Sequence, residues 1–370
     1  MTHQTFLTPG AGGCVGSPSL SRRSLLAALG AITAGITLQP RHAWSAAEEK
    51  KLNFYNWDTY IGETTLIDFK KASGIEVKMD LYADNDELFA KLKAGNPGYD
   101  VVVPSHDFVE RMIKAGMLMP LDHAMLPNKV NIDPVFQEAT FDPGRAYSMP
   151  YTWGSIGIGY RKSAVDSVPD SWKWLYDSDT YSGHIALLGD GATVIELGLK
   201  YLGHSLNTTD TARIKQVEQM VIKQKPHIKV FAKDNGQDLL LSGEVDLAME
   251  SNGDILQVIS EDDNISYVVP KEGTALWQDC LCIPKGAPHP RNAHQFINFI
   301  LTADVSAAIA KTIQYATPNT AAKAKMPEAY RHNPAIFPPP DVMRHSEMSA
   351  YLGEALKRVI DETWTRIQAA

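Results

Sequence analysis

The chain has 370 residues, and 43 acidic against 35 Lys and Arg side chains give it a formal net charge of −8. An acidic surface is a poor match for nucleic acid, whose phosphates require a basic face, so we expect no nucleic-acid partner. The charge suits small cationic solutes instead. Cys280 and Cys282 are two apart in a predicted strand, so both face one side and are expected to be buried thiols.

The first 46 residues are typical of a secretory signal. They contain no Asp, Glu or Lys, and Arg22-Arg23 precede an apolar run from Leu25 to Leu38 that ends near small residues. Paired arginines before such a run indicate the bacterial twin-arginine route. The apolar run is too short to span a bilayer. We therefore predict a Tat-type signal peptide over residues 1–46, cleavage, and export of a soluble protein to the periplasm.

From residue 51 onward, short apolar strands alternate with amphipathic helices. Strands are predicted over 51–55, 75–82 and 99–104, and helices over 64–74, 85–95 and 108–116. Asn85 is the predicted N-cap of the second helix. Strands separated by helices indicate βαβ units, so a mostly parallel sheet covered by helices is expected.

Two long extended runs interrupt this alternation. Residues 147–161 contain Pro150 and three glycines and have no neighbouring helix, and residues 274–284 form a similar run after a second α/β set. Such runs are predicted to cross between two lobes of an α/β fold. The expected boundaries are 47–152 plus 273–315 for the first lobe and 153–272 plus 316–370 for the second.

Ligands of open α/β sheets bind beyond the carboxyl ends of the strands. Aromatic and polar residues follow several predicted strands there, and carboxylates with aromatic faces suit an organic ammonium group. The candidate ligand-binding residues are Trp57, Asp58, Tyr60, Ser105, Asp190, Thr193, Glu250, Ser251, Asp254, Trp277, Asp279 and Tyr315.

Other interpretations of some of these residues stay open. Ser105, Asp107 and Asp254 each precede a predicted helix and could serve as N-caps. Trp57 and Trp277 could pack in a core, and His106 is expected at the surface or at a helix cap.

Catalytic motifs are missing from the sequence. It has no G-x-S-x-G, H-E-x-x-H or P-loop pattern, and its eleven histidines have no paired spacing on one helix. We therefore expect no enzyme, no catalytic residues, no metal and no cofactor.

Several segments in order, "NFYNWDTYI", "GYDVVVPS", "AGMLMPLD", "MPYTWGSIGIGY", "VVPKEG" and "YATPN", resemble the periplasmic spermidine/putrescine-binding proteins of bacterial polyamine ABC importers. The resemblance runs through residues 51–340. It implies the type II periplasmic binding fold, a ligand cleft between two lobes, and delivery of the ligand to a membrane permease. It further implies that Trp57 and Tyr60 line the cleft, together with Ser105, Asp190, Asp254, Trp277, Asp279 and Tyr315.

The sequence departs from the family pattern at two positions. Thr193 stands where an acidic residue is usual, and Ser251 stands where a Trp is usual. A diamine needs an anion for each end, and Asp58, Asp190 or Glu250 are the candidates for the second end. The alternative is another amine-bearing solute on the same fold, such as an ω-amino acid or an opine-like compound. Arg161 or Lys233 in the cleft would favour that alternative.

Ferric-ion binding on this fold would require a tyrosine pair, and no adjacent tyrosines stand near Tyr315. The protein is expected to be a monomer. Its lobes are predicted to close on the ligand about hinges near 150–156 and 271–278.

Overall fold

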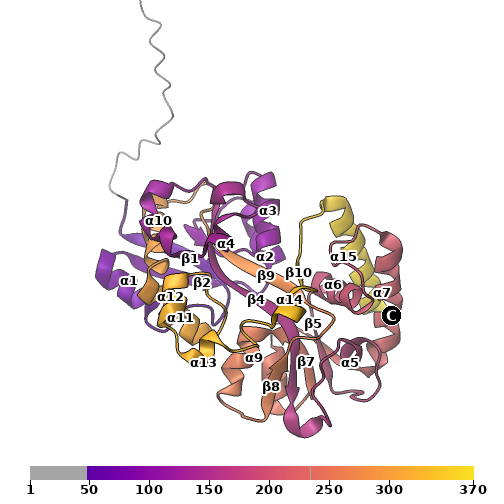
Figure 1. Cartoon of the computed structure of the whole chain (residues 1–370). Helices are drawn as coiled ribbons and strands as arrows, with labels where there is room; N and C mark the ends of the chain where they lie inside the picture. Colours follow the sequence, from indigo (N-terminus) through magenta and orange to yellow (C-terminus); the bar gives the residue numbers. More distant parts are fainter. Residues whose placement is uncertain (1–47, 234) are drawn as a thin grey trace, which may run out of the picture. The chain divides into compact units, whose positions relative to one another are not determined.

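The structure, a computed structural model, describes residues 48–233 and 235–370 (Figure 1). The predicted signal peptide lies outside the described residues. Glu48–Ala370 forms one unit, and all strands and helices named below belong to it.

The described strands form a mixed sheet in the order β2-β1-β3-β9-β4-β7-β5-β6, with β10 paired to β9 and β8 paired to β4. Their bounds are β1 Lys51–Asn56, β2 Glu76–Leu81, β3 Val101–Val102, β4 Ser148–Arg161, β5 Ile185–Leu188, β6 Ile228–Ala232, β7 Leu247–Ser251, β8 Ile265–Val268, β9 Ala275–Cys282 and β10 Glu347–Met348. The helices are α1 Thr65–Ser73, α2 Asn85–Lys93, α3 His106–Lys114, α4 Pro134–Gln137, α5 Lys173–Tyr176, α6 Gly191–Tyr201, α7 Thr211–Gln224, α8 Gly236–Ser242, α9 Asn252–Ile259, α10 Pro290–Ile300, α11 Ala303–Ile313, α12 Thr320–Lys325, α13 Glu328–Arg331, α14 Pro340–Met343 and α15 Glu354–Ala369.

At one end of the sheet, β1 pairs in parallel with both β2 and β3. Phe54 in β1 is fully buried against Phe296 of α10, with ring centroids 5.1 Å apart. Helix α1 ends as predicted at Gly74, whose φ of 73° lies in the left-handed region that glycine adopts without strain. The predicted cap of α2 is wrong: Asp84 is the N-cap and accepts a hydrogen bond from the Glu87 N–H, whereas Asn85 is the first helical residue.

Strands β4 and β9 lie in the middle of the sheet and correspond to the two predicted extended runs. They pair antiparallel to each other, and β4 also pairs antiparallel with β7 and β8. The sheet is therefore mixed: parallel pairing is confined to its two ends and to the short β10, and the expectation of a mostly parallel sheet is wrong at its centre. Gly154 of β4 lies against Trp277 of β9, and a Cβ there would come within 2.5 Å of the indole ring. Glycine therefore permits the close approach of these strands.

At the other end of the sheet, β5 pairs in parallel with β6 and β7. Leu187 and Val194 are fully buried in a second apolar core that includes Val217 of α7. The C-terminal helix α15 lies against α6 and α7. This end repeats the strand–helix alternation of the first, as the sequence predicts.

Cys280 and Cys282 of β9 are both buried and form no disulfide. Burial raises the pKa of the Cys280 thiol to about 12, so it stays protonated near neutral pH. The prediction of buried thiols is confirmed.

Among the described residues, no single helix has the length and apolarity needed to cross a membrane. Helices α10 and α11 have that length and apolarity only when taken together, and the chain bends by 76° between them.

Candidate functional site

Asp279, on β9, holds the central carboxylate of the candidate site. The residue is 5% exposed, and its Oδ1 accepts a hydrogen bond from Ser105 Oγ at 2.6 Å. Its Oδ2 accepts one from Tyr60 Oη at 2.9 Å. Burial, and then the Asp279 charge, raise the pKa of Tyr60, so its phenol stays a hydrogen-bond donor. Two neutral hydroxyls thus hold the carboxylate in place.

Three aromatic rings lie next to this carboxylate. Tyr315 packs edge-on against Tyr60, with centroids 5.5 Å apart, and against Trp277 at 4.9 Å. Its Oη donates to Asp254 Oδ2 at 2.6 Å. Six predicted residues are therefore in one continuous cluster, which we call the Asp279 cluster: Tyr60, Ser105, Asp254, Trp277, Asp279 and Tyr315.

The local sequence explains how Tyr315 reaches Asp254. Gly253 lies under the Tyr315 ring, where a Cβ would come within 2.6 Å of three ring carbons. Gln314, just before Tyr315, has a φ of 59° and ends α11 in the left-handed conformation. The chain therefore turns sharply out of α11 and lays the ring on the first turn of α9.

Trp57 is partly buried beside the cluster. Its Nε1–H donates to the Val103 carbonyl at 2.9 Å, two residues before Ser105. Its ring lies 4.6 Å from that of Tyr82. Trp57 also packs against two of the apolar cores, so it has packing contacts as well as a place next to the cluster.

The N-cap interpretation does not hold for three residues. Ser105 stands at the N-cap position of α3, but its hydroxyl makes no capping bond and goes to Asp279. Asp107 and Asp254 lie inside the first turns of α3 and α9. His106, expected at the surface or at a cap, is 3% exposed. It binds the Ser349 carbonyl through Nε2 at 2.7 Å and accepts the Gln278 N–H at Nδ1.

Asp190 and Thr193 lie together at the start of α6. Asp190 is the N-cap, and its carboxylate accepts from the backbone of Ala192 and Thr193 and from Thr193 Oγ1 at 2.5 Å. The Asp190 charge reaches Asp107: burial raises the pKa of Asp107, His106 opposes the rise, and Asp190 adds to it. Ser349 links the two helices, because its carbonyl binds His106 of α3 and its hydroxyl donates to Glu196 of α6 at 2.7 Å.

For three further predicted residues, the described contacts are outside the Asp279 cluster. Asp58 is exposed and accepts the N–H of its neighbour Thr59. Glu250 is fully buried, and its carboxylate accepts from the backbone N–H groups of Gly236 and Ser251. Ser251 is the N-cap of α9 but makes no side-chain capping bond.

Sequence analysis missed four residues near these groups. Thr152 contacts Tyr60 through its hydroxyl, and Asn85 hydrogen-bonds Ser105. Asp107, considered only as a cap, and Glu196 are acidic neighbours of Asp190. Burial raises the pKa of Glu196 to about 8, Ser349 opposes the rise, and Asp107, Asp190 and Glu347 contribute to it. Glu196 lies one helical turn after Thr193, and this i,i+3 spacing is the signal that could have identified it.

The Asp279 cluster combines the two kinds of group that suit an organic cation. Carboxylates form charge-assisted hydrogen bonds with ammonium groups, and aromatic faces attract them. The hydroxyls of Ser105 and Tyr60 donate to a carboxylate and not to an imidazole, so neither is arranged as the nucleophile of a Ser–His pair. In residues 48–233 and 235–370, no group of three His, Cys, Asp or Glu side chains could hold a metal ion.

Comparisons with known proteins agree with this geometry. The model of the family described as "Bacterial extracellular solute-binding protein" matches residues 66–338. The putrescine-binding periplasmic protein SpuD of Pseudomonas aeruginosa is 34% identical over 342 residues, which cover 88% of this chain and 93% of SpuD. The spermidine/putrescine-binding periplasmic protein of Escherichia coli is 35% identical over 349 residues, covering 94% and 98%.

A solved structure titled as a putative spermidine/putrescine ABC transporter from Listeria monocytogenes superposes with a TM-score of 0.82 at 32% identity, covering 86% of this chain and 99% of that one. The predicted resemblance and the α/β type II periplasmic binding fold are confirmed. The family binds solutes, so the expectation that the protein is no enzyme is also confirmed. The chain belongs to the bacterial extracellular solute-binding protein family.

Proposed function

We propose that this protein is the periplasmic solute-binding component of an ABC importer and binds a polyamine, putrescine or spermidine. The observation that carries the proposal is the buried Asp279 carboxylate, held by Ser105 and Tyr60 beside the rings of Trp277 and Tyr315. Relatives that match nearly the whole chain are named for putrescine and spermidine. The importer's membrane permease is the expected partner.

One ammonium group binds at the Asp279 cluster. Asp279 supplies the first carboxylate and Asp254, bound by Tyr315 Oη, supplies the second. Each charge-assisted hydrogen bond in such a buried site contributes about 1.5–3 kcal/mol. The aromatic rings contribute a further ~0.5–2 kcal/mol per cation–π contact.

The second ammonium group binds near the N-terminal ends of α3 and α6. Asp190, Asp107 and Glu196 influence one another electrostatically, which supports a shared negative potential there. These side chains compensate for Thr193 at the usually acidic position. Asp58 and Glu250 are weaker candidates, because Asp58 is exposed and the Glu250 carboxylate already accepts two backbone N–H groups.

The ligand is enclosed by closure of two lobes with the boundaries predicted from the sequence, about hinges near 150–156 and 271–278. Two ion pairs support a closed form. Arg111 of α3 pairs with Glu354 of α15 at 2.8 Å, and Lys357 of α15 pairs with Asp86 of α2 at 3.2 Å. Closure excludes water and strengthens the ammonium contacts. The permease then selects the closed form, whose population the ligand increases.

One observation favours the alternative ligand, an ω-amino acid. Trp277 Nε1 is buried and, in the part of the chain that the structure describes, has no hydrogen-bond partner. An ammonium group has no acceptor to offer it, whereas a carboxylate or a water has one. A ligand carboxylate would also need a cationic side chain, however, and neither of the two predicted candidates is well placed to pair with it. Arg161 donates to the Leu240 carbonyl and lies 3.9 Å from Asp262, and Lys233 is exposed.

Calorimetric titration of the exported mature protein with putrescine, spermidine and 4-aminobutyrate tests the choice. We expect a polyamine to bind more tightly than 4-aminobutyrate and to lose affinity as salt rises, because screening weakens ion pairs. Preference for 4-aminobutyrate would contradict the polyamine assignment and support the alternative.

We further propose that the chain is exported by the twin-arginine route, loses residues 1–46 and acts as a monomer. Replacing Arg22 and Arg23 together with Lys should leave the precursor in the cytoplasm. Normal export of that variant would point to another route. Sedimentation of the mature protein should give the mass of one chain.

A further inference from the structure

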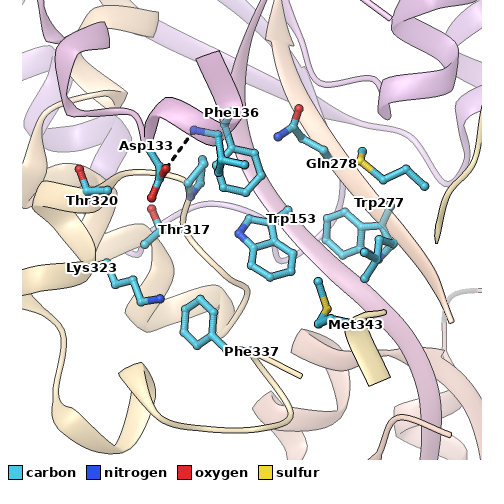
Figure 2. A pocket seen from close by; sticks show the side chains of 14 residues that line it. Asp133, Phe136, Trp153, Trp277, Gln278, Thr317, Thr320, Lys323, Phe337 and Met343 are labelled. Atoms are coloured by element: carbon cyan, nitrogen blue, oxygen red, sulfur yellow. Dashed lines mark hydrogen bonds between the residues drawn. The ribbon is translucent and has the colours of Figure 1, made fainter. Parts of the chain in front are cut away.

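A separate cavity lies beside the crossing strands and is shown in Figure 2. Its volume is about 360 Å³, within the range typical of small-molecule sites. Among the candidate ligand-binding residues of the Asp279 site, Trp277 alone lines it. The lining residues are Asp133, Val135, Phe136, Trp153, Leu276, Trp277, Gln278, Thr317, Pro318, Thr320, Lys323, Phe337, Met343 and Met348.

The walls of this cavity are mainly aromatic. The Trp153 ring lies 5.9 Å from that of Phe136 and 5.9 Å from that of Phe337. In Figure 2 the Trp153 indole stands between these two phenyl rings, and Met343 lies below it. Met side chains adapt to irregular apolar surfaces. Such walls suit a flat apolar body.

One cation, Lys323 of α12, extends into this aromatic environment. Its Nζ lies 3.6 Å from the centre of the Phe337 ring, and Figure 2 shows it directed toward the space between Phe337 and Trp153. Within residues 48–233 and 235–370 it forms no ion pair, whereas Lys325 on the same helix pairs with Asp304 at 2.6 Å. Burial lowers the pKa of Lys323, Asp133 opposes that change, and Arg331 adds to it.

The charge around Lys323 favours an anion. Lys323 and Arg331 are positive, and Asp133 is the negative group that acts on Lys323. One Asp133 oxygen is already occupied, because it accepts the Val135 N–H at 3.0 Å. A carboxylate placed on Lys323 would replace the part of its hydration that partial burial removes.

We propose that this cavity is a second ligand site, which binds a flat apolar molecule carrying one carboxylate. The apolar body lies against Trp153, Phe136 and Phe337, and the carboxylate pairs with Lys323 Nζ. The site is distinct in charge from the Asp279 cluster, so it does not depend on polyamine binding.

The test compares three probes of equal apolar size: 3-phenylpropionate, 3-phenylpropanol and 3-phenylpropylamine. Calorimetric titration of the mature protein should show the carboxylate binding about tenfold or more tightly than the alcohol. The amine should bind more weakly still, because Lys323 repels it. Equal affinities for the carboxylate and the alcohol, or a preference for the amine, would overturn the proposal.

Variants locate the site. Lys323→Met should remove the preference for the carboxylate, and Lys323→Arg should retain most of it. Lys325→Met is the matched control, since it removes an exposed Lys from the same helix and should change nothing. Trp153→Ala should weaken all three probes alike, with thermal unfolding used to verify the fold. Equal losses in Lys323→Met and Lys325→Met would contradict the assigned contact.

Putrescine titration of the same variants separates this inference from the proposed function. Lys323→Met should leave putrescine affinity unchanged. Failure of 3-phenylpropionate to bind a protein that binds putrescine would overturn the second site alone. Binding of 3-phenylpropionate to a protein that binds neither putrescine nor spermidine would contradict the polyamine assignment alone.

Discussion

The Asp279 cluster and the Lys323 cavity both have aromatic walls, but the cluster contains two carboxylates, whereas the cavity contains the ammonium group of Lys323 beside Asp133. Both are lined by aromatic rings, both use β9, and Trp277 contributes to each. The cluster places a buried carboxylate beside its rings, whereas the cavity places an ammonium group over one. Aromatic walls thus set the shape of a site, and the ionised side chains beside them decide whether it suits a cation or an anion.

The backbone of β9 makes this separation possible. Successive strand residues point to opposite faces, so Gln278 lines the cavity while its neighbour Asp279 joins the cluster. Arg145 Nη2 donates to Gln278 Oε1 at 2.8 Å and fixes that side chain. If the two regions are chemically independent, a change in one should leave binding at the other unaltered.

The largest effect is expected for Asp279→Asn. Removing the buried charge should weaken putrescine binding by about 2 kcal/mol or more, since an ammonium group would lose its charged partner. Calorimetry should show this loss while 3-phenylpropionate affinity stays unchanged. Asp304→Asn, at an exposed ion pair, is the control. Unchanged putrescine affinity would remove Asp279 from the site. Equal loss of affinity for putrescine and for 3-phenylpropionate would show that the two regions are not independent.

Trp57→Ala should produce the next largest loss. The variant loses the surface of the indole ring that would contact the ligand and its cation–π attraction. The free energy of putrescine binding should therefore weaken by about 0.5–2 kcal/mol. The Nε1 bond to Val103 and the core contacts also suggest a lower Tm, although the fold should persist. Calorimetry and thermal unfolding measure the two effects. A large fall in Tm with unchanged putrescine affinity would make Trp57 a packing residue only.

Putrescine affinity should rise with pH, and Glu196 is the reason. Its pKa is raised to about 8 in the folded protein, so it is largely protonated near pH 7 and gains charge as pH increases. The pKa of Glu196 is higher in the folded protein than in the unfolded chain, where it is about 4.5. The neutral carboxyl group therefore stabilises the fold below about pH 4.5, and this stabilisation is lost progressively as the pH rises to about 8. A bound cation offsets that loss. Binding near pH 7 should therefore release a proton.

Calorimetry in buffers of different ionisation enthalpy detects the released proton. Glu196→Gln should remove most of the pH dependence of putrescine affinity and raise the free energy of unfolding near pH 9. The same substitution should leave the affinity for 3-phenylpropionate unchanged. Asp107, Asp190, Glu347 and Ser349 also face this carboxyl group. A pH profile unaltered by Glu196→Gln would assign the titration to Asp107 instead, because burial also raises the pKa of that carboxyl group.

The smallest effect is expected for Arg111→Met. This change breaks the ion pairs of α3 with Glu354 and with Asp86. Partly exposed pairs contribute about 1 kcal/mol or less, so putrescine should dissociate a few times faster and the difference should shrink in high salt. Lys114→Met, which breaks a pair with Glu110 inside α3, is the matched control. Stopped-flow release that is equally fast in both variants would show that the α3–α15 contact does not hold the closed form.

The sequence by itself determined the α/β class, the two crossing runs and the family. Alternating polarity and helical spacing are local properties, so β1, α1 and β2 lie close to their predicted ranges. Residues next to strand ends were also predictable, because strand ends gather at one edge of a sheet. Tyr60, Ser105, Asp254, Trp277, Asp279 and Tyr315 came from that rule together with the resemblance.

The tertiary structure alone decided which of these residues meet and which groups join them. Thr152 lies opposite Asp279 because the register of β4 on β9 shifts at Pro150 and Thr152, and a shift in pairing leaves no local trace in sequence. Asp84 replaced Asn85 as the cap of α2 because the Asn85 amide binds Ser105. The Lys323 cavity joins Phe136, Trp153 and Phe337, which are far apart along the chain. Their meeting depends on long-range packing, which patterns of neighbouring residues do not encode.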